Sequence, residues 1–216
     1  MEISERQKVQ ILSELAEANR MLTSIENLAL RDTPFCCVVT SAAWGEGKTT
    51  LTAGLGMIAA KRANKNILAI DMNWYSPGLH RCFELVPEWD LMRYSQDKNM
   101  KAMIRPSGSA NLDILTAPVS NGHDGSFSSE NSDLAQSILK QAREAYDFIL
   151  VDTAAVFPTN RRMIDPVVLG NAGDAVILVV LTGVTPRQQI KRAQMMLESS
   201  GVKLAGVVVN HWKDKL

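Results

Sequence analysis

The chain has 216 residues with 23 basic and 23 acidic side chains, and this zero formal net charge argues against the broad basic face that nucleic-acid binding requires. Its 46% hydrophobic and 21% charged content is that of a soluble globular protein. Because no apolar run approaches the roughly 18 residues of a membrane helix, we expect no membrane span. The residues from Glu2 onward are polar, so we expect no secretory signal. The three cysteines lack metal-ligand spacing, so we expect reduced thiols in the cytoplasm.

Residues 4–30 predict one amphipathic helix, because apolar side chains recur there at three- and four-residue steps. Pro34 follows and stops helical continuation. A helix that precedes the first strand has to pack on the outside of the sheet or on another subunit, and we assign it to residues 1–31. Glu17 and Arg20 lie one turn apart on it, a spacing that also suits a solvated ion pair.

The stretch Phe35–Thr50, FCCVVTSAAWGEGKTT, predicts a strand, a glycine-containing loop and the start of a helix. Apolar residues from Leu51 onward continue at helical spacing. In this setting the pattern [GA]-x-x-x-x-G-K-[ST] is a phosphate-binding P-loop, whereas a glycine turn before a basic helix start is the simpler alternative. The pattern is filled by Ala42, Gly47, Lys48 and Thr49.

Each part of this loop has a physical role in the predicted site. Gly45 and Gly47 allow backbone N–H groups to face phosphate oxygens, and the helix that begins near Lys48 adds its positive dipole end. Lys48 would reach the β- and γ-phosphates, and the Thr49 hydroxyl would bind Mg²⁺. Trp44 would stack on a neighbour or the ligand, or pack at the surface. We predict that ATP contacts Ala43, Gly45, Glu46, Gly47, Lys48, Thr49 and Thr50.

Strands and helices alternate through the rest of the chain. Residues 120–132 are polar and rich in turn formers, which predicts a loop. The predicted strands are Asn66–Asp71, Asn111–Leu115, Phe148–Asp152, Asp174–Leu181 and Leu204–Asn210. The predicted helices are 88–105 (a weak pattern), the segment from the cap Ser132-Asp133 to Ala145, and Pro186–Ser199, and a short helix or turn begins at Asp165-Pro166. Apolar strands that alternate with helices predict an α/β fold with one doubly wound, mainly parallel sheet and helices on both faces, in a single domain of residues 1–216.

Two predicted strands end in an acid beside the P-loop. Parallel α/β sheets bind ligands at the carboxyl ends of their strands, where Asp71 and Asp152 lie. One such acid would hold Mg²⁺ through water, and the other would orient or deprotonate the attacking group; a purely structural role is the alternative. Asn210, at the end of the last strand, offers an amide donor and acceptor that could read adenine.

Four segments resemble one family. TSAAWGEGKTT resembles TSxxPGEGKST, IDMNWYSPGLHRCFEL resembles the Walker A′ segment IDxDxRxPxLHxxF, and YDFILVDTAAV resembles the Walker B segment YDxVIIDTPPV. GDAVILVVLTGVTPRQQIKRAQMMLESSGVKLAGVVVN is similar to the closing strand-helix-strand. From about residue 14 to its end, the chain thus resembles the deviant-Walker P-loop ATPases related to septum-site and partitioning ATPases. Within them it resembles the bacterial tyrosine kinases (BY-kinases) that govern capsular and exopolysaccharide synthesis. Ala43 stands where partitioning ATPases have a signature lysine, which favours the kinase branch.

The resemblance implies roles for individual residues. Lys48 binds phosphate, Asp71 is the base and Asp152 is the Walker B acid, so that Thr49, Asp71 and Asp152 handle Mg²⁺. Several positions depart from the family: Asn73 replaces the second Walker A′ aspartate, Tyr75 its arginine and Ala154-Ala155 the paired prolines, and no tyrosine cluster follows Asn210. Glu17 and Arg20 match the oligomerisation motif Glu-x-x-Arg-x-x-Arg, in which Thr23 replaces the last arginine.

The implied function is that of an ATP·Mg²⁺-dependent tyrosine autokinase that regulates exopolysaccharide or capsule synthesis and export. One alternative is an ATPase switch or pseudokinase that acts as a nucleotide-dependent scaffold, and another is a positioning ATPase of the septum or chromosome type. The implied partner is the cytoplasmic part of a membrane-spanning polysaccharide co-polymerase or adaptor, which would hold the protein at the inner face of the cell membrane. A homo-oligomer would form through Glu17 and Arg20 of the N-terminal helix.

Overall fold

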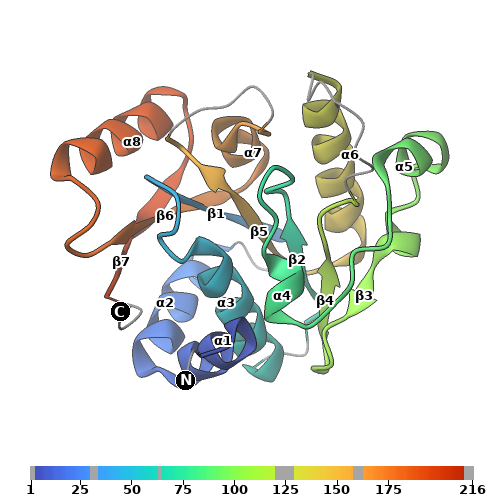
Figure 1. Ribbon diagram of the computed structural model, residues 1–216, viewed down its shortest axis with the longest axis horizontal. Helices are drawn as coiled ribbons and strands as arrows, with labels where there is room; N and C mark the ends of the chain where they lie inside the picture. Colours follow the sequence, from blue (N-terminus) through green and yellow to red (C-terminus); the bar gives the residue numbers. More distant parts are fainter. Residues whose placement is uncertain (1–2, 30–33, 63–64, 120–128, 158–162, 212–216) are drawn as a thin grey trace.

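The protein is built around a mainly parallel β-sheet, as the sequence predicts. The computed structural model describes residues 3–29, 34–62, 65–119, 129–157 and 163–211 (Figure 1). Within them lie the strands β1 (Phe35–Ser41), β2 (Ile67–Asp71), β3 (Arg105–Pro106), β4 (Leu112–Leu115), β5 (Phe148–Ala155), β6 (Ala175–Leu181) and β7 (Leu204–Asn210). Their order is β3-β4-β2-β5-β1-β6-β7, and only β3 runs antiparallel to its neighbour. The predicted fold class is confirmed.

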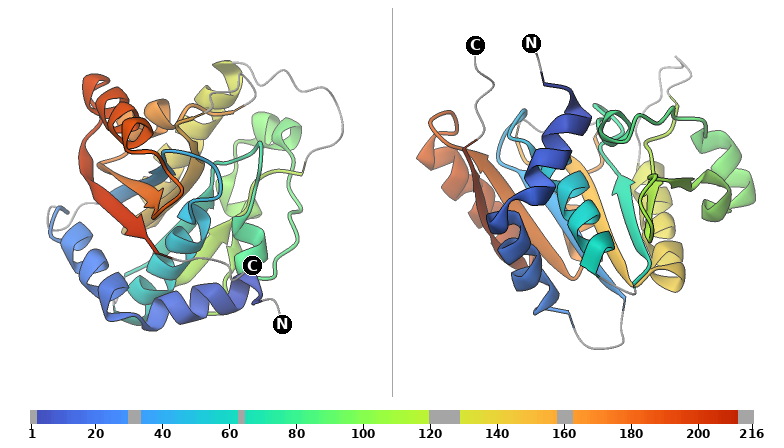
Figure 2. Two further views of the ribbon diagram at one scale, coloured as in Figure 1. Left: turned by 60° about the vertical axis from the view of Figure 1, so that its left-hand side comes forward. Right: turned by 90° about the horizontal axis from the view of Figure 1, so that it is seen from below.

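Helices cover both faces of this sheet. The described helices are α1 (Glu5–Glu14), α2 (Ala16–Glu26), α3 (Lys48–Arg62), α4 (Leu79–Cys82), α5 (Leu91–Asp97), the 3₁₀ helix η1 (Met100–Met103), α6 (Ser129–Ala145), α7 (Pro166–Ala172) and α8 (Arg187–Ser199). Figures 1 and 2 show α1 to α4 on one face and α6 to α8 on the other. Among the described helices, none is both long enough and apolar enough to cross a membrane.

The central strands are apolar throughout because both of their faces are buried. In β1, Cys36 and Val38 belong to the core cluster under α6 to α8, whereas Cys37 and Val39 belong to the cluster under α1 to α4. Successive side chains of a strand point to opposite faces, so a two-sided core removes the alternation with polar residues. The two core clusters, one on each face, fix the position of the sheet edge at which β1, β2 and β5 end.

The prediction of one continuous helix over residues 4–30 is wrong, because the helix breaks at Leu15. Ser4 begins α1 with a capping box, and Leu15 takes an extended conformation with ψ 134° between α1 and α2. At about 1.5 Å per residue a straight helix over this stretch would run far past α3, on which both pieces pack. The break keeps the apolar faces of both α1 and α2 on α3. Leu12 of α1 lies so close to Gly54 of α3 that a Cβ on Gly54 would come within 2.0 Å of the Leu12 side chain.

Two further segments differ from the sequence predictions. Residues 88–105 form α5 and η1 rather than one helix, since Lys98 ends α5 in the left-handed conformation with φ 44°. Helix α6 begins at Ser129 instead of at the predicted cap Ser132-Asp133; serine is a cap-type residue at both places, so the sequence allows either start. Most of the predicted loop 120–132, namely residues 120–128, lies outside the described residues.

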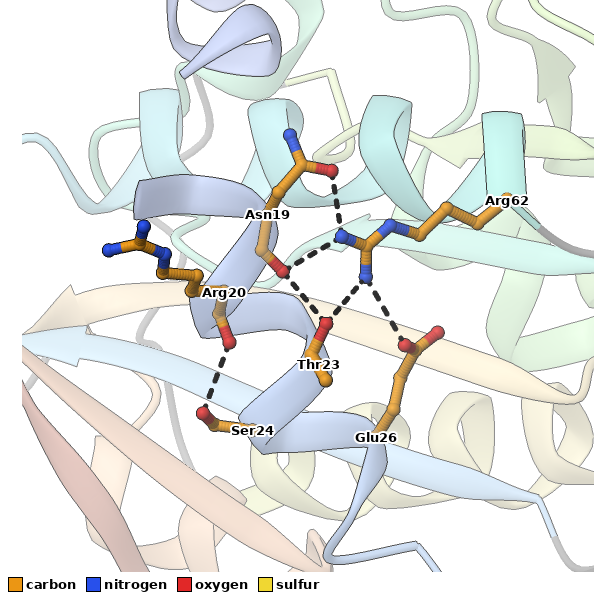
Figure 3. A network of polar contacts seen from close by, with 6 residues as sticks. All are labelled: Asn19, Arg20, Thr23, Ser24, Glu26 and Arg62. Atoms are coloured by element: carbon orange, nitrogen blue, oxygen red, sulfur yellow. Dashed lines mark hydrogen bonds and ion pairs between the residues drawn. The ribbon is translucent and has the colours of Figure 1, made fainter. Parts of the chain in front are cut away.

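Arg62, at the end of α3, holds α2 in place (Figure 3). Its guanidinium donates to the Thr23 hydroxyl (2.9 Å) and to the carbonyl and side-chain oxygens of Asn19 (3.0 and 2.8 Å), and it lies 3.6 Å from the Glu26 carboxylate. Arg20 points away from this network. Thr23, which stands where the family motif has its last arginine, therefore makes a contact within the chain.

Candidate nucleotide-binding site

The P-loop lies between β1 and α3 and needs its glycines. Gly45 and Gly47 have φ values of 74° and 89°, a region that side chains other than glycine rarely enter. A Cβ on Gly47 would also come within 2.5 Å of Asn210 Nδ2. Backbone conformation therefore favours glycine at both positions, and at Gly47 a side chain would also clash with Asn210.

Glu46 ties the P-loop to the rest of the protein. Its carboxylate is buried, accepts the Ala43 N–H at 2.6 Å and accepts a hydrogen bond from the Thr185 hydroxyl in the segment between β6 and α8. The Glu46 carbonyl accepts the Asn210 amide at 3.0 Å. The side chain of Glu46 therefore faces the protein, so only its backbone is placed to meet a ligand. The sequence did not indicate Thr185.

The Thr49 hydroxyl and the Asp152 carboxylate meet beneath the P-loop. Thr49 Oγ1 donates to Asp152 Oδ2 at 2.6 Å, and Asp152 is completely buried. Asp152 Oδ1 is buried without a hydrogen-bond partner among the described residues. A buried carboxylate oxygen without a donor is unfavourable unless a further group binds it. Lys48, only 7% exposed, supplies positive charge to the site.

Asp71 is held by three backbone donors. Its carboxylate accepts the N–H groups of Asn73, Gly78 and Leu79, each at 3.0 Å. Gly78 and Leu79 begin α4, so Asp71 also fixes the start of that helix. The pairing of β2 with β5 places Asp71 beside Asp152. The two acids that the sequence places at separate strand ends are neighbours in the sheet.

Burial makes both carboxylates hard to ionise. Desolvation raises the pKa of Asp71 to about 6, against the opposing effect of its three N–H donors and of Lys48. Desolvation and, to a smaller extent, the negative charge of Asp71 raise the pKa of Asp152 to about 8, against the opposing effect of Lys48. One lysine thus faces two buried acids, and the site attracts additional positive charge.

Asn73 organises the loop that follows β2. Its side-chain amide donates to the Ser76 carbonyl at 2.7 Å, and the Ser76 N–H donates to the Asn73 carbonyl at 3.1 Å. An aspartate, which carries no side-chain donor when ionised, could not make the first of these bonds. Asparagine therefore has a structural use at the position where the family motif has its second acid.

A cavity of about 1020 Å³ opens beside the P-loop. Its lining comes from the P-loop, the loop after β2, the end of β7 and helices α1 and α2. Predicted residues on the lining are Gly45, Gly47, Lys48, Thr49, Thr50, Asn210 and Glu17. Asp71 and Asp152 are fully buried next to it. Arg81, on α4, is a cationic lining residue that sequence reasoning missed, and its only signal was its place in the Walker A′ segment.

The donor set fits Mg²⁺ together with phosphate. Among the described residues there is no group of three or more His, Cys, Asp and Glu side chains that could hold a metal alone. Mg²⁺ does not need one, since it is usually bound by one or two carboxylates, water and substrate phosphates. Asp152 Oδ1 and the Thr49 hydroxyl offer such ligands beside the backbone of the P-loop.

A glycine loop between the first strand and a helix, set on this parallel sheet, defines the protein as a P-loop NTPase. No protein-family model matches the chain. Tyrosine-protein kinase YwqD of Bacillus subtilis (strain 168) is 30% identical over 175 residues, with 80% of this chain and 70% of YwqD covered. The succinoglycan biosynthesis transport protein ExoP of Rhizobium meliloti (strain 1021) is 26% identical, with 80% of this chain but 22% of ExoP covered.

Solved structures share the fold. The kinase domain of the Escherichia coli tyrosine kinase ETK superimposes with a TM-score of 0.75 at 20% identity, over 92% of this chain and 76% of that one. The septum site-determining protein MinD of Pyrococcus horikoshii OT3, complexed with Mg-ADP, has a TM-score of 0.65 at 22% identity, over 83% and 71% of the two chains. On the match to YwqD, the chain belongs to the bacterial tyrosine kinase family, as its motifs predict.

Proposed function

We propose that the protein is an ATP·Mg²⁺-dependent tyrosine kinase that acts in exopolysaccharide or capsule synthesis, with residues 1–216 forming one nucleotide-binding domain. The observation that carries this proposal is the buried Thr49–Asp152 pair, whose Asp152 Oδ1 has no partner among the described residues, directly below a P-loop. A Mg²⁺ ion with nucleotide phosphates would satisfy that oxygen. The tyrosine kinase YwqD, a member of the same family, supports the reaction type.

The residues divide into three groups by their task. Lys48 and the P-loop backbone bind phosphate, and Asn210, which donates to the loop, holds it in shape beside the nucleotide. Thr49 and Asp152 bind Mg²⁺, which when present neutralises charge on the phosphates. Asp71 is oriented by three N–H donors, and its raised pKa suits a group that takes the proton of an acceptor hydroxyl. With Mg²⁺ bound, the negative charge of Asp71 beside Asp152 would also stabilise the ion.

A partner chain completes the proposed function. ExoP is a biosynthesis transport protein of which this chain covers only 22%, so the chain resembles one part of ExoP. The cytoplasmic part of a membrane-spanning polysaccharide co-polymerase would bind the protein and hold it at the inner face of the membrane. Self-association through α2 would use Glu17 and Arg20, since Thr23 is occupied by Arg62.

Labelled ATP tests the reaction directly. The purified chain is incubated with γ-labelled ATP and Mg²⁺, with and without a tyrosine-rich acceptor peptide. We expect label on tyrosine that is lost in Asp71→Asn and Lys48→Met, since the first removes the base without changing its shape and the second removes a phosphate contact. Asp113→Asn, in a strand remote from the P-loop, is the matched control and should keep the label. Bound ATP without labelled tyrosine would refute the kinase.

A second candidate function is an ATPase switch, and Asn73 is the observation that favours it. Its amide is used to close the loop after β2, so the site has one acid fewer than the family motif. Release of phosphate without labelled tyrosine, together with partner binding that depends on nucleotide, would establish the switch. ATP-dependent dimers on a membrane or DNA would instead indicate a positioning ATPase.

A further inference from the structure

The loop after β2 presents a tyrosine at its tip. Residues 73–76 form a turn that is closed by the two hydrogen bonds between Asn73 and Ser76. Trp74 points inward: its Nε1 donates to the Asp71 carbonyl at 3.0 Å, and its ring packs edge-on against Trp89. Its neighbour Tyr75 is left on the outside of the turn and is 40% exposed.

Tyr75 lies against the P-loop. Its ring contacts that of Trp44 edge-on, with 5.6 Å between centroids and 85° between planes. Trp44 lines the nucleotide cavity, as do the two residues that close the turn, Asn73 and Ser76. Further along the same loop, a Cβ on Gly78 would come within 3.1 Å of Thr49 Cγ2. The loop that carries Tyr75 therefore runs beside the Mg²⁺ ligand Thr49, where the terminal phosphate is expected.

The other two tyrosines of the chain have hydroxyls that are already used. Tyr94 is 2% exposed, donates to the Ser137 hydroxyl and accepts from Gln141. Tyr146 donates to Asp113 at 2.8 Å, and burial together with this hydrogen bond raises its pKa. The Tyr75 hydroxyl has no hydrogen-bond partner within the described part of the chain. Of the three, only Tyr75 combines an exposed side chain with a contact to a residue that lines the cavity.

We propose that Tyr75 is a phosphorylation site of this protein and receives the γ-phosphoryl group of ATP bound at the P-loop. In the transfer, the Tyr75 hydroxyl oxygen forms a bond to the γ-phosphorus, and the bond from that phosphorus to the bridging oxygen of ADP breaks. The electron pair leaves with ADP, and the phenolic proton passes to the Asp71 carboxylate, the base of the proposed function, and from there to solvent. Within one chain or between two copies, the products are ADP and phosphotyrosine at position 75. This inference rests on the proposed kinase function.

The accessibility of Tyr75 can be tested without turnover. The ligand-free chain is treated briefly with tetranitromethane, and the nitrated tyrosines are located by mass spectrometry. We expect Tyr75 to react at least ten times faster than Tyr94 and Tyr146, because Tyr75 is exposed, whereas Tyr94 is buried and Tyr146 is partly buried and bonded to Asp113. Equal or faster nitration of Tyr146 would overturn the assignment of Tyr75 as the accessible tyrosine.

Phosphorylation is then mapped after incubation with γ-labelled ATP and Mg²⁺ in the presence of a tyrosine-rich peptide. The variant Tyr75→Phe keeps the ring that contacts Trp44 and removes only the hydroxyl, and Tyr146→Phe is its matched control. We expect Tyr75→Phe to label the peptide but to lose at least nine-tenths of the label on the chain itself, and Tyr146→Phe to label both. Concentration dependence of self-labelling distinguishes transfer between copies from transfer within one chain.

The outcomes separate this inference from the proposed function. If Tyr75→Phe still labels itself, Tyr75 is not the acceptor, although the proposed kinase function stands. The same conclusion follows if the wild-type chain labels the peptide but not itself. Absence of label from both peptide and chain refutes the kinase, and the acceptor with it. Phosphate mapped to Tyr75 in the wild type and missing in the variant supports the proposal.

Discussion

Replacing Asp152 by asparagine should stabilise the Mg²⁺-free protein at neutral and alkaline pH. Asp152 is fully buried beside Asp71, and one lysine faces the two acids. Asparagine keeps the shape and still accepts the Thr49 hydroxyl. The change removes a buried negative charge, so the free energy of unfolding should rise even though a ligand of the site is lost.

The magnitude follows from the pKa of Asp152. Burial and Asp71 raise it from 3.8 to about 8, and each unit is worth about 1.4 kcal/mol, which sets an upper bound near 6 kcal/mol. Relaxation and water penetration reduce such penalties, and we expect a gain of about 2–4 kcal/mol at pH 8. Because the folded-state pKa lies above the unfolded value, the wild type should lose stability as pH rises from about 4 to about 8.

Urea denaturation in EDTA at pH 5 and pH 8 measures both effects. The advantage of Asp152→Asn should be small at pH 5, where the wild-type carboxylate is protonated, and large at pH 8. Added Mg²⁺ and ATP should stabilise the wild type but not the variant. Asp113→Asn, a partly exposed strand acid, is the control and should show no such pH dependence. A variant less stable than the wild type at pH 8 would refute the reasoning.

Three other substitutions test the frame around the site, each by chemical denaturation. Gly54→Ala should cost about 1–3 kcal/mol, because its Cβ would come within 2.0 Å of Leu12, and Leu12→Ala in the same chain should recover part of the loss. Arg62→Met should cost about 1–2 kcal/mol through the lost bonds to α2, whereas its exposed neighbour in Lys61→Met should cost little. Asn73→Asp should cost about 1–3 kcal/mol without Mg²⁺, since the donor to the Ser76 carbonyl is lost and a charge enters a buried position. Additive losses of stability in Gly54→Ala and Leu12→Ala would contradict the contact between these residues. Equal losses in Arg62→Met and Lys61→Met would contradict the bonds from Arg62 to α2, and an unchanged free energy of unfolding in Asn73→Asp would contradict the bond from Asn73 to Ser76.

Local patterns were enough to predict the main features of the fold. The strand, glycine loop and helix of the P-loop are contiguous in the sequence, so their order and the need for glycine at 45 and 47 can be read there. Two-sided burial makes the central strands continuous apolar runs, which identified β1, β2, β5 and β6 within a few residues. The strand β7 was predicted from the same kind of apolar run, although it lies largely exposed at the edge of the sheet. Parallel strands end at one edge of the sheet, which is why the sequence alone places Asp71 and Asp152 near the loop.

Contacts between distant residues could not be predicted in this way. The buried Glu46 carboxylate reaches Thr185, and Thr23 meets Arg62, but no periodicity relates these positions. The break at Leu15 leaves the apolar spacing of α1 and α2 almost intact, so the sequence predicts one helix. Two shorter helices form because one straight helix would extend past α3, on which both pack.

The sequence by itself therefore determined the sheet, the P-loop, the two acids and the family, because each depends on spacing within a short stretch. Only the tertiary structure decided how the acids share one lysine, that the Asn73 side chain closes a turn, and that Tyr75 lies against Trp44 at the rim of the cavity. The physical reason is that burial and side-chain partners arise from packing between segments far apart in the chain, whose relative positions no local pattern encodes.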